Sequence, residues 1–215
     1  MISGIALLTS LVLAANPPAP PSEPLVLETM ALIASLRLPA PSDTTYAETR
    51  FSKLLRKPIE LHGGLHYGGA GVLGKRVDAP YRETTMIANG EVTVQREGKG
   101  SRRFALERAP ELEALLASFS ALLSGDAAEL NRHFTLALQR HDAQWRLTLT
   151  PRAPDLAKHL HELIVDGRDA AVRCVSLHEA DGDASVMRIG ALAATSLTQP
   201  ATPVALDALC SDAQR

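Results

Sequence analysis

The chain has 215 residues, and its 22 Lys and Arg nearly balance its 24 Asp and Glu, for a formal net charge of −2. This balance argues against a nucleic-acid-binding protein, which would carry a strongly basic surface. The length fits one domain with a substantial hydrophobic core.

The chain begins with an apolar run, residues 5–15, which is shorter than the about 20 residues that span a membrane. Val12 and Ala14 lie where small residues precede signal cleavage. We therefore expect residues 1–14 to be a signal peptide that directs the protein to the periplasm. Because no Lys or Arg precedes the apolar run, an uncleaved N-terminal anchor is the alternative.

A proline-rich linker is expected over residues 15–24, because proline is excluded from helix interiors. The next segment, Leu25 to Leu38, carries apolar residues at helical spacing and is followed by Pro39. This pattern predicts a helix that ends before the proline.

Residues 45–107 predict five or six short antiparallel strands joined by tight glycine turns. Asn89-Gly90 joins two runs of alternating apolar and polar residues, which is a strong hairpin signal. Such a sheet has one apolar face. The segment "APELEALLASFSALL", residues 109–123, follows directly and predicts an apolar helix that lies across this face.

The second half of the chain predicts a short helix in "PRAPDLAKHLHE" and a further set of strands. These strands are Phe134–Gln139, Trp145–Thr150, Leu163–Asp166, Val172–Glu179 and Ser185–Leu192. We assign residues 25–192 to one domain. From Ala193 onward the residues are small and polar, so we expect residues 193–215 to form a loosely ordered tail.

The predicted fold class is α+β, mainly β: an unclosed antiparallel half-barrel covered by helices. Only 4% of residues are aromatic, so a broad curved sheet is hard to fill with side chains. An apolar cavity for flexible acyl chains is one interpretation, and a tightly packed core is the other. The candidate lipid-binding residues are Phe51, Leu65, Met86, Val94, Phe104, Leu115, Phe119, Leu122 and Leu149.

The two cysteines are an even number, which allows a disulfide in an exported protein. Cys174 lies in a predicted strand and Cys210 in the tail. A bond between them would join the tail to the sheet, and free thiols are the alternative because sequence gives no Cα separation.

No pattern in the chain favours catalysis or metal binding. His62 and His66 lie four residues apart, about 13 Å along a strand, too far to share one ion. Glu179, Asp181 and Asp183 lack the remaining ligands of a calcium loop. No serine lies in a nucleophile elbow. We therefore expect a protein that is not an enzyme and that has no metal or cofactor.

The order of helix, strands, helix and strands resembles the periplasmic outer-membrane lipoprotein carrier family (LolA-like). The resemblance is closer to a divergent branch often encoded beside glycolipid or polyene export machinery. The matching segments are "ETRFSKLLRKPIELHGGLHY", "APYRETTMIANGEVTV", "RRFALERAPELEALLASFSALLSGD", "WRLTLTPR" and "SLHEADGDASVMRI".

The resemblance implies a carrier, with a monomer as its working form, that shields acyl chains of a lipoprotein or (glyco)lipid during transport towards the outer membrane. Its partners would be an inner-membrane donor and an outer-membrane acceptor, and no nucleic acid. The alternative is a periplasmic interaction module that docks on a cell-envelope export complex without binding lipid.

The chain departs from the family at one residue. The family's carriers have an arginine six residues before the proline, which helps to keep the empty lid closed. Counted back from Pro80, this place holds Gly74, with Lys75 and Arg76 beside it. Arg76 takes that role only if a bulge at the glycine shifts the strand. The tail also lacks the family's aromatic final strand, and both departures favour a different lipid cargo.

Overall fold

The computed structural model describes residues 23–197 and 201–211. The expected signal peptide, residues 1–14, lies outside the described residues, as does most of the linker. Glu23 and Pro24, which we expected to end the linker, are the first residues of a helix. No helix in the described part of the chain is long and apolar enough to cross a membrane.

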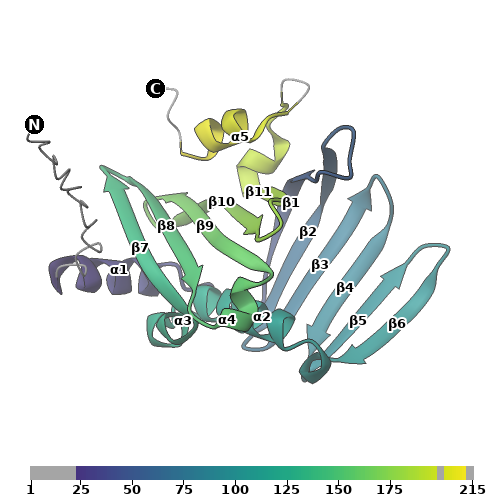
Figure 1. The fold of residues 1–215 in the computed structure, drawn as a ribbon, viewed down its shortest axis with the longest axis horizontal. Coiled ribbons are helices and arrows are strands. Elements are labelled where there is room, and N and C mark those ends of the chain that lie inside the picture. The colour runs from purple at the N-terminus through teal and green to yellow at the C-terminus, as the bar shows by residue number, and fades with distance from the viewer. Residues whose placement is uncertain (1–22, 198–200, 212–215) are drawn as a thin grey trace, which may run out of the picture.

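The strands form one open antiparallel sheet of 11 strands in the order β6-β5-β4-β3-β2-β1-β11-β10-β9-β8-β7 (Figure 1). β6 and β7 are its two edges, so the sheet does not close. This confirms the predicted mainly-β, unclosed antiparallel architecture. The strands are β1 Ser42–Phe51, β2 Ile59–Gly69, β3 Val72–Ala79, β4 Glu83–Ala88, β5 Glu91–Arg96, β6 Gly100–Ala105, β7 Phe134–His141, β8 Gln144–Pro151, β9 Leu160–Arg168, β10 Ala171–Glu179 and β11 Ala184–Ile189.

Two of the helices connect the two halves of the sheet along the chain, and the helices pack on the faces of the sheet. They are α1 Glu23–Ser35, α2 Pro110–Ser124, α3 Ala127–His133, α4 Pro154–Ala157 and α5 Pro203–Cys210, with 3-10 turns η1 Leu106–Arg108 and η2 Gly190–Ala194. α2 matches the predicted helix within one residue. Pro110 begins it and Gly125 ends it in the left-handed conformation (φ 72°), which suits a residue without a Cβ.

The strand register divides the side chains between two faces. The helix face carries Tyr46 of β1 and Leu147 of β8, and α1–α4 pack against its C-terminal half. The outer face carries Ala47 of β1 and Cys174 of β10, and η2 and α5 lie on that side. Both faces of the central strands are therefore covered.

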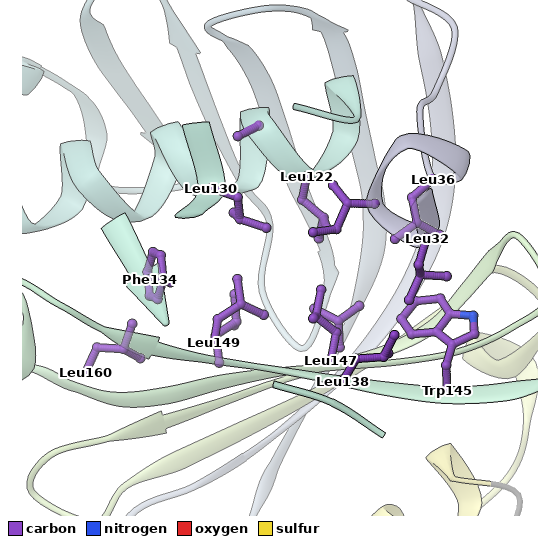
Figure 2. Close-up of a cluster of buried hydrophobic side chains, with 14 of the residues drawn as sticks. Leu32, Leu36, Leu122, Leu130, Phe134, Leu138, Trp145, Leu147, Leu149 and Leu160 are labelled. Atoms are coloured by element: carbon purple, nitrogen blue, oxygen red, sulfur yellow. The ribbon is translucent and has the colours of Figure 1, made fainter. Parts of the chain in front are cut away.

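The main core lies on the helix face of β7–β9. Figure 2 shows helical leucines pointing towards side chains that rise from the sheet. The residues of this core that are labelled there are Leu32, Leu36, Leu122, Leu130, Phe134, Leu138, Trp145, Leu147, Leu149 and Leu160. The interdigitation leaves this half of the sheet packed with side chains.

A second, smaller core holds the C-terminal segment on the outer face. Cys174 and Cys210 form a disulfide with a Cα–Cα distance of 5.6 Å, and Leu206 is fully buried beside it. The buried Arg188 donates hydrogen bonds to the carbonyl oxygen of Leu192 and to the carboxylate of Glu60. The charge of Arg188 is thus paired where burial would otherwise be costly.

The prediction of a loosely ordered tail was wrong for residues 203–210, which form α5. The segment is rich in small residues, but two of its residues, Leu206 and Cys210, are buried against the sheet. They lie four residues apart and therefore on one side of a helix. Thr202 caps the helix, because its side chain accepts a hydrogen bond from the N–H of Ala205 at 3.1 Å.

We predict that Leu149→Ala lowers the free energy of unfolding by about 2–5 kcal/mol, because Leu149 is fully buried in the filled core. Denaturant unfolding measures this change. Thr150→Ala, at the exposed neighbour, is the matched control and should change stability by less than about 0.5 kcal/mol. A similarly small loss for Leu149→Ala would instead indicate space around that side chain.

We also predict that unfolded, unreduced protein reacts with no thiol-labelling reagent. Replacing both Cys174 and Cys210 by alanine should then lower the free energy of unfolding by roughly 2–4 kcal/mol, since the bond closes a loop across 36 residues of sequence separation. Reduced wild-type protein is the control and should be destabilised similarly. Two labelled thiols per unreduced chain would contradict the bond.

Candidate functional site

The helix face of β2–β6 is the part of the sheet that the helices leave largely uncovered. Paired residues on this face form cross-strand rows, and the row nearest α2 is entirely apolar or aromatic. This apolar row consists of Tyr67, Leu73, Ile87, Val92 and Phe104. The next one, the mixed row, consists of Leu65, Lys75, Thr85, Val94 and Arg102. The third, the charged row, consists of Gly63, Val77, Glu83 and Arg96.

The apolar, mixed and charged rows together define one patch on the helix face of β2–β6. Neighbouring strands are about 4.8 Å apart and alternate residues on a strand about 7 Å, so the patch is roughly 20 Å wide and about 13 Å deep. Val92 is buried, whereas Leu65, Val94 and Phe104 are only half-buried. The patch therefore presents aliphatic surface that the protein does not fully cover.

Helix α2 borders the patch at its apolar row. The N–H of Leu106, in η1, donates to the carbonyl of Gly90 at 2.8 Å, which places the entry to α2 at the β4–β5 turn. The N–H of Gly71 donates to Ser120 Oγ at 3.3 Å, which places the middle of α2 at the β2–β3 turn. The helix thus crosses the ends of these strands, as Figure 1 also shows.

Two stripes of α2 have different surroundings. One stripe, Leu115, Phe119 and Leu122, belongs to or packs against the main core. Leu112 and Leu116 share a side with Ser120, which contacts the β2–β3 turn, and both are half-buried. The second stripe therefore extends the apolar border of the patch.

A charged cluster lies on the same face, away from α2. Glu48 is 4% exposed and accepts a hydrogen bond from Arg50 Nε at 2.7 Å and another from Lys75 Nζ. Burial alone would raise the pKa of Glu48, but the hydrogen bond from Arg50 and the charge of Lys75 outweigh it and hold that pKa below its usual value. Two cations therefore share one ionised carboxylate.

Aromatic rings form the floor and the rim of this cluster. The Lys75 ammonium lies 5.0 Å from the ring centre of Tyr46, and the Arg96 guanidinium lies 4.0 Å from that of Tyr81. Gly63 lies between Tyr46 and Val77 in the charged row. An added Cβ there would lie 1.8 Å from the carbonyl oxygen of Arg76. Only glycine fits this position.

The buried hydroxyl of Tyr46 has no hydrogen-bond partner within the described residues. Burial, followed by the charge of Glu48, raises the pKa of this phenol well above its ordinary value. Tyr46 is therefore neutral and serves as an apolar floor for the cluster.

The predicted lipid-binding residues fall into three groups. Leu65, Val94 and Phe104 lie together on the uncovered patch, from β2, β5 and β6. Leu115, Phe119, Leu122 and Leu149 come together in and around the packed core. A role for either group in lipid binding stays a prediction.

The third group, Phe51 and Met86, lies on the outer face and therefore away from the uncovered patch. Phe51 lies on the outer face and packs beside Val186, because β1 is a central strand with both faces covered. Met86 pairs with Gly74 on the outer face, where an added Cβ on the glycine would lie 3.1 Å from Met86 Cε. Because Gly74 has no side chain, the Met86 side chain can occupy the space beside it.

The three residues near the family's arginine position lie on different faces. Gly74 and Arg76 are on the outer face, where Arg76 Nε lies 2.9 Å from Asp78. Their pairing with β2 is regular, so no bulge at Gly74 brings Arg76 to the helix face. Lys75 is the basic residue that faces inward.

Sequence reasoning missed the cluster of Glu48, Arg50 and Lys75. The two-residue spacing of Glu48 and Arg50 on a strand was the available signal, because it places both on one face. Their proximity to Lys75 depends on the pairing of β1 with β2 and of β2 with β3, which sequence alone does not give.

The outer face of β1–β6 carries two open grooves of about 540 and 550 Å³. In the first, Asp43, His66, Arg76 and Met86 surround a floor that includes Gly64. His66 Nδ1 lies 2.9 Å from Asp43 Oδ1 on this outer face. Both grooves are lined largely from the side of the sheet opposite to the aliphatic patch.

No group of three or more His, Cys, Asp or Glu within the described ranges is arranged to hold a metal ion. His62 Nε2 lies 3.7 Å from Glu60 on the outer face. The arrangement on the helix face is one of apolar surface with charges at one end, which suits binding of an amphiphile.

Comparisons with known proteins place the chain in a family. The model described as "Outer membrane lipoprotein carrier protein LolA-like" matches residues 21–213. A LolA superfamily protein from Nitrosomonas europaea is 8% identical, with a TM-score of 0.41 and coverage of 81% of this chain and 95% of that one. A DUF1329 family protein from Desulfovibrio piger is 10% identical, with a TM-score of 0.44 and the same coverages of 81% and 95%. No curated protein matches the chain. Since the family model spans most of its length, this chain belongs to the LolA-like family of outer-membrane lipoprotein carriers.

Proposed function

We propose that this protein is a periplasmic carrier that shields acyl chains of a lipoprotein or (glyco)lipid on their way to the outer membrane. The observation that carries the proposal is the half-buried aliphatic patch on the helix face of β2–β6, bordered by α2. The family is one of carriers, which agrees with binding without catalysis.

The proposed site lies beside α2 and not beneath its middle. The stripe formed by Leu115, Phe119 and Leu122 is already engaged by the core, whereas Leu112 and Leu116 border the uncovered strands. An acyl chain would therefore run along the apolar row towards Phe104, between this border and the mixed-row residues Leu65 and Val94. Each methylene that it buries contributes about 0.8 kcal/mol.

Proteins of the LolA-like family are periplasmic. We propose the same location here, with an inner-membrane donor and an outer-membrane acceptor as partners and a monomer as the working form. Mass spectrometry of the protein purified from its host, without added detergent, tests the central claim. Bound lipid supports the carrier, and a lipid-free protein recovered with an export complex would favour the docking module instead.

We predict that Val94→Asp lowers binding of a fluorescent fatty-acyl probe at least tenfold, because a carboxylate on the patch opposes burial of the chain. Gln95→Asp is the matched control, since Gln95 is the next residue of β5 and points to the outer face. Circular dichroism shows whether both variants are folded. Equal probe binding by the two folded variants would exclude the patch from the site.

Export is tested separately. We expect N-terminal sequencing of protein from a periplasmic extract to begin near Ala15, as the small residues Val12 and Ala14 predict. Recovery of intact Met1 in the membrane fraction would instead indicate an N-terminal anchor.

A further inference from the structure

The two faces of strands β1–β6 carry opposite charge. On the helix face, four cations accompany two carboxylates: Arg50, Lys75, Arg96 and Arg102 with Glu48 and Glu83. On the outer face, two cations accompany four carboxylates: Arg76 and Arg103 with Asp43, Glu60, Asp78 and Glu91. The excess positive charge therefore lies on the face that carries the aliphatic patch.

These cations are ordered along the strands. The apolar row next to α2 contains none, the mixed row contains Lys75 and Arg102, and the charged row contains Arg96. The charged row is about 13 Å from the apolar row, since residues four apart on a strand are separated by that distance. The patch thus changes from apolar beside α2 to cationic at the mixed row, whereas Arg96 in the charged row is paired with Glu83.

Lys75 and Arg50 are held in place and yet reachable. Each binds the buried Glu48 carboxylate, while the Lys75 side chain is 26% exposed and that of Arg50 is 46% exposed. One carboxylate neutralises one of these two charges, so the second is available to a ligand. A fixed, partly desolvated cation binds an anion more strongly than a freely moving surface lysine does.

We infer that the cargo is an amphiphile with an anionic headgroup, such as a phosphate, sulfate or carboxylate, whose head binds Lys75 and Arg50 while its chain lies along the apolar row. This inference rests on the proposed function, because it uses the same patch. It adds the chemical class of the headgroup, which the apolar surface alone does not define.

The test compares single-chain amphiphiles of equal length, each used below its micelle concentration, for displacement of a fluorescent fatty-acyl probe. Dodecyl phosphate should bind roughly three- to tenfold more tightly than dodecyl phosphocholine or dodecyl maltoside, the range expected for a partly exposed charge interaction. The preference should decrease as salt increases. Inorganic phosphate alone should displace little probe.

Two variants locate the preference. Lys75→Gln should reduce binding of dodecyl phosphate and leave that of dodecyl maltoside within about twofold. Arg76→Gln is the matched control, because Arg76 is the adjacent residue and points to the outer face. Should Lys75→Gln fail to fold, Arg50→Gln replaces it, since the Arg50 side chain is 46% exposed and binds the same Glu48 carboxylate.

The outcomes separate this inference from the proposed function. Probe binding with equal affinity for all three amphiphiles would overturn the inference and leave the carrier intact. Displacement by inorganic phosphate as strong as that by dodecyl phosphate would indicate an anion site unrelated to acyl chains, and would also overturn it. A protein that binds no acyl probe would remove both.

Discussion

An 11-stranded open sheet presents more apolar surface than its helices can cover, and this mismatch shapes the molecule. At about 4.8 Å per strand the sheet is roughly 50 Å wide, whereas the 15 residues of α2 span about 22 Å. The helices pack on β7–β9, where Leu147 and Leu149 complete a filled core. The helix face of β2–β6 is left with one bordering helix, and that remainder is the proposed site.

The outer face of the sheet is covered for a different structural reason. β11 and β1 join the packed half to the uncovered half, so their outer side must also be held. The buried Arg188, paired with Glu60 across β1, and the bond between Cys174 and Cys210 do this together on the outer face, where Arg188 and Cys174 are cross-strand partners. The C-terminal segment therefore supports the junction between the halves, and the helix face is left free for binding.

Local patterns predicted much of this fold, and long-range pairing accounts for what they missed. The Asn89-Gly90 turn and the alternation of Val92 and Val94 gave β4, β5 and their register, because hairpins are determined by neighbouring residues. Alternation also implied one apolar face per strand, an assumption that fails for Phe51 in a strand covered on both sides. The inward-facing Lys75 depends on pairings between strands distant in sequence.

The patch and the charges contribute unequally to binding. An acyl chain of roughly ten methylenes along the apolar row would gain about 8 kcal/mol at about 0.8 kcal/mol for each methylene. A contact of an anionic head with the partly exposed Lys75 contributes only about 1 kcal/mol. Affinity therefore comes from the chain and selectivity from the head. Because Lys75 and Arg50 lie at the β1 side of the patch and Phe104 at its β6 edge, one orientation of an amphiphile satisfies both, with its chain towards Phe104 and its head towards Lys75.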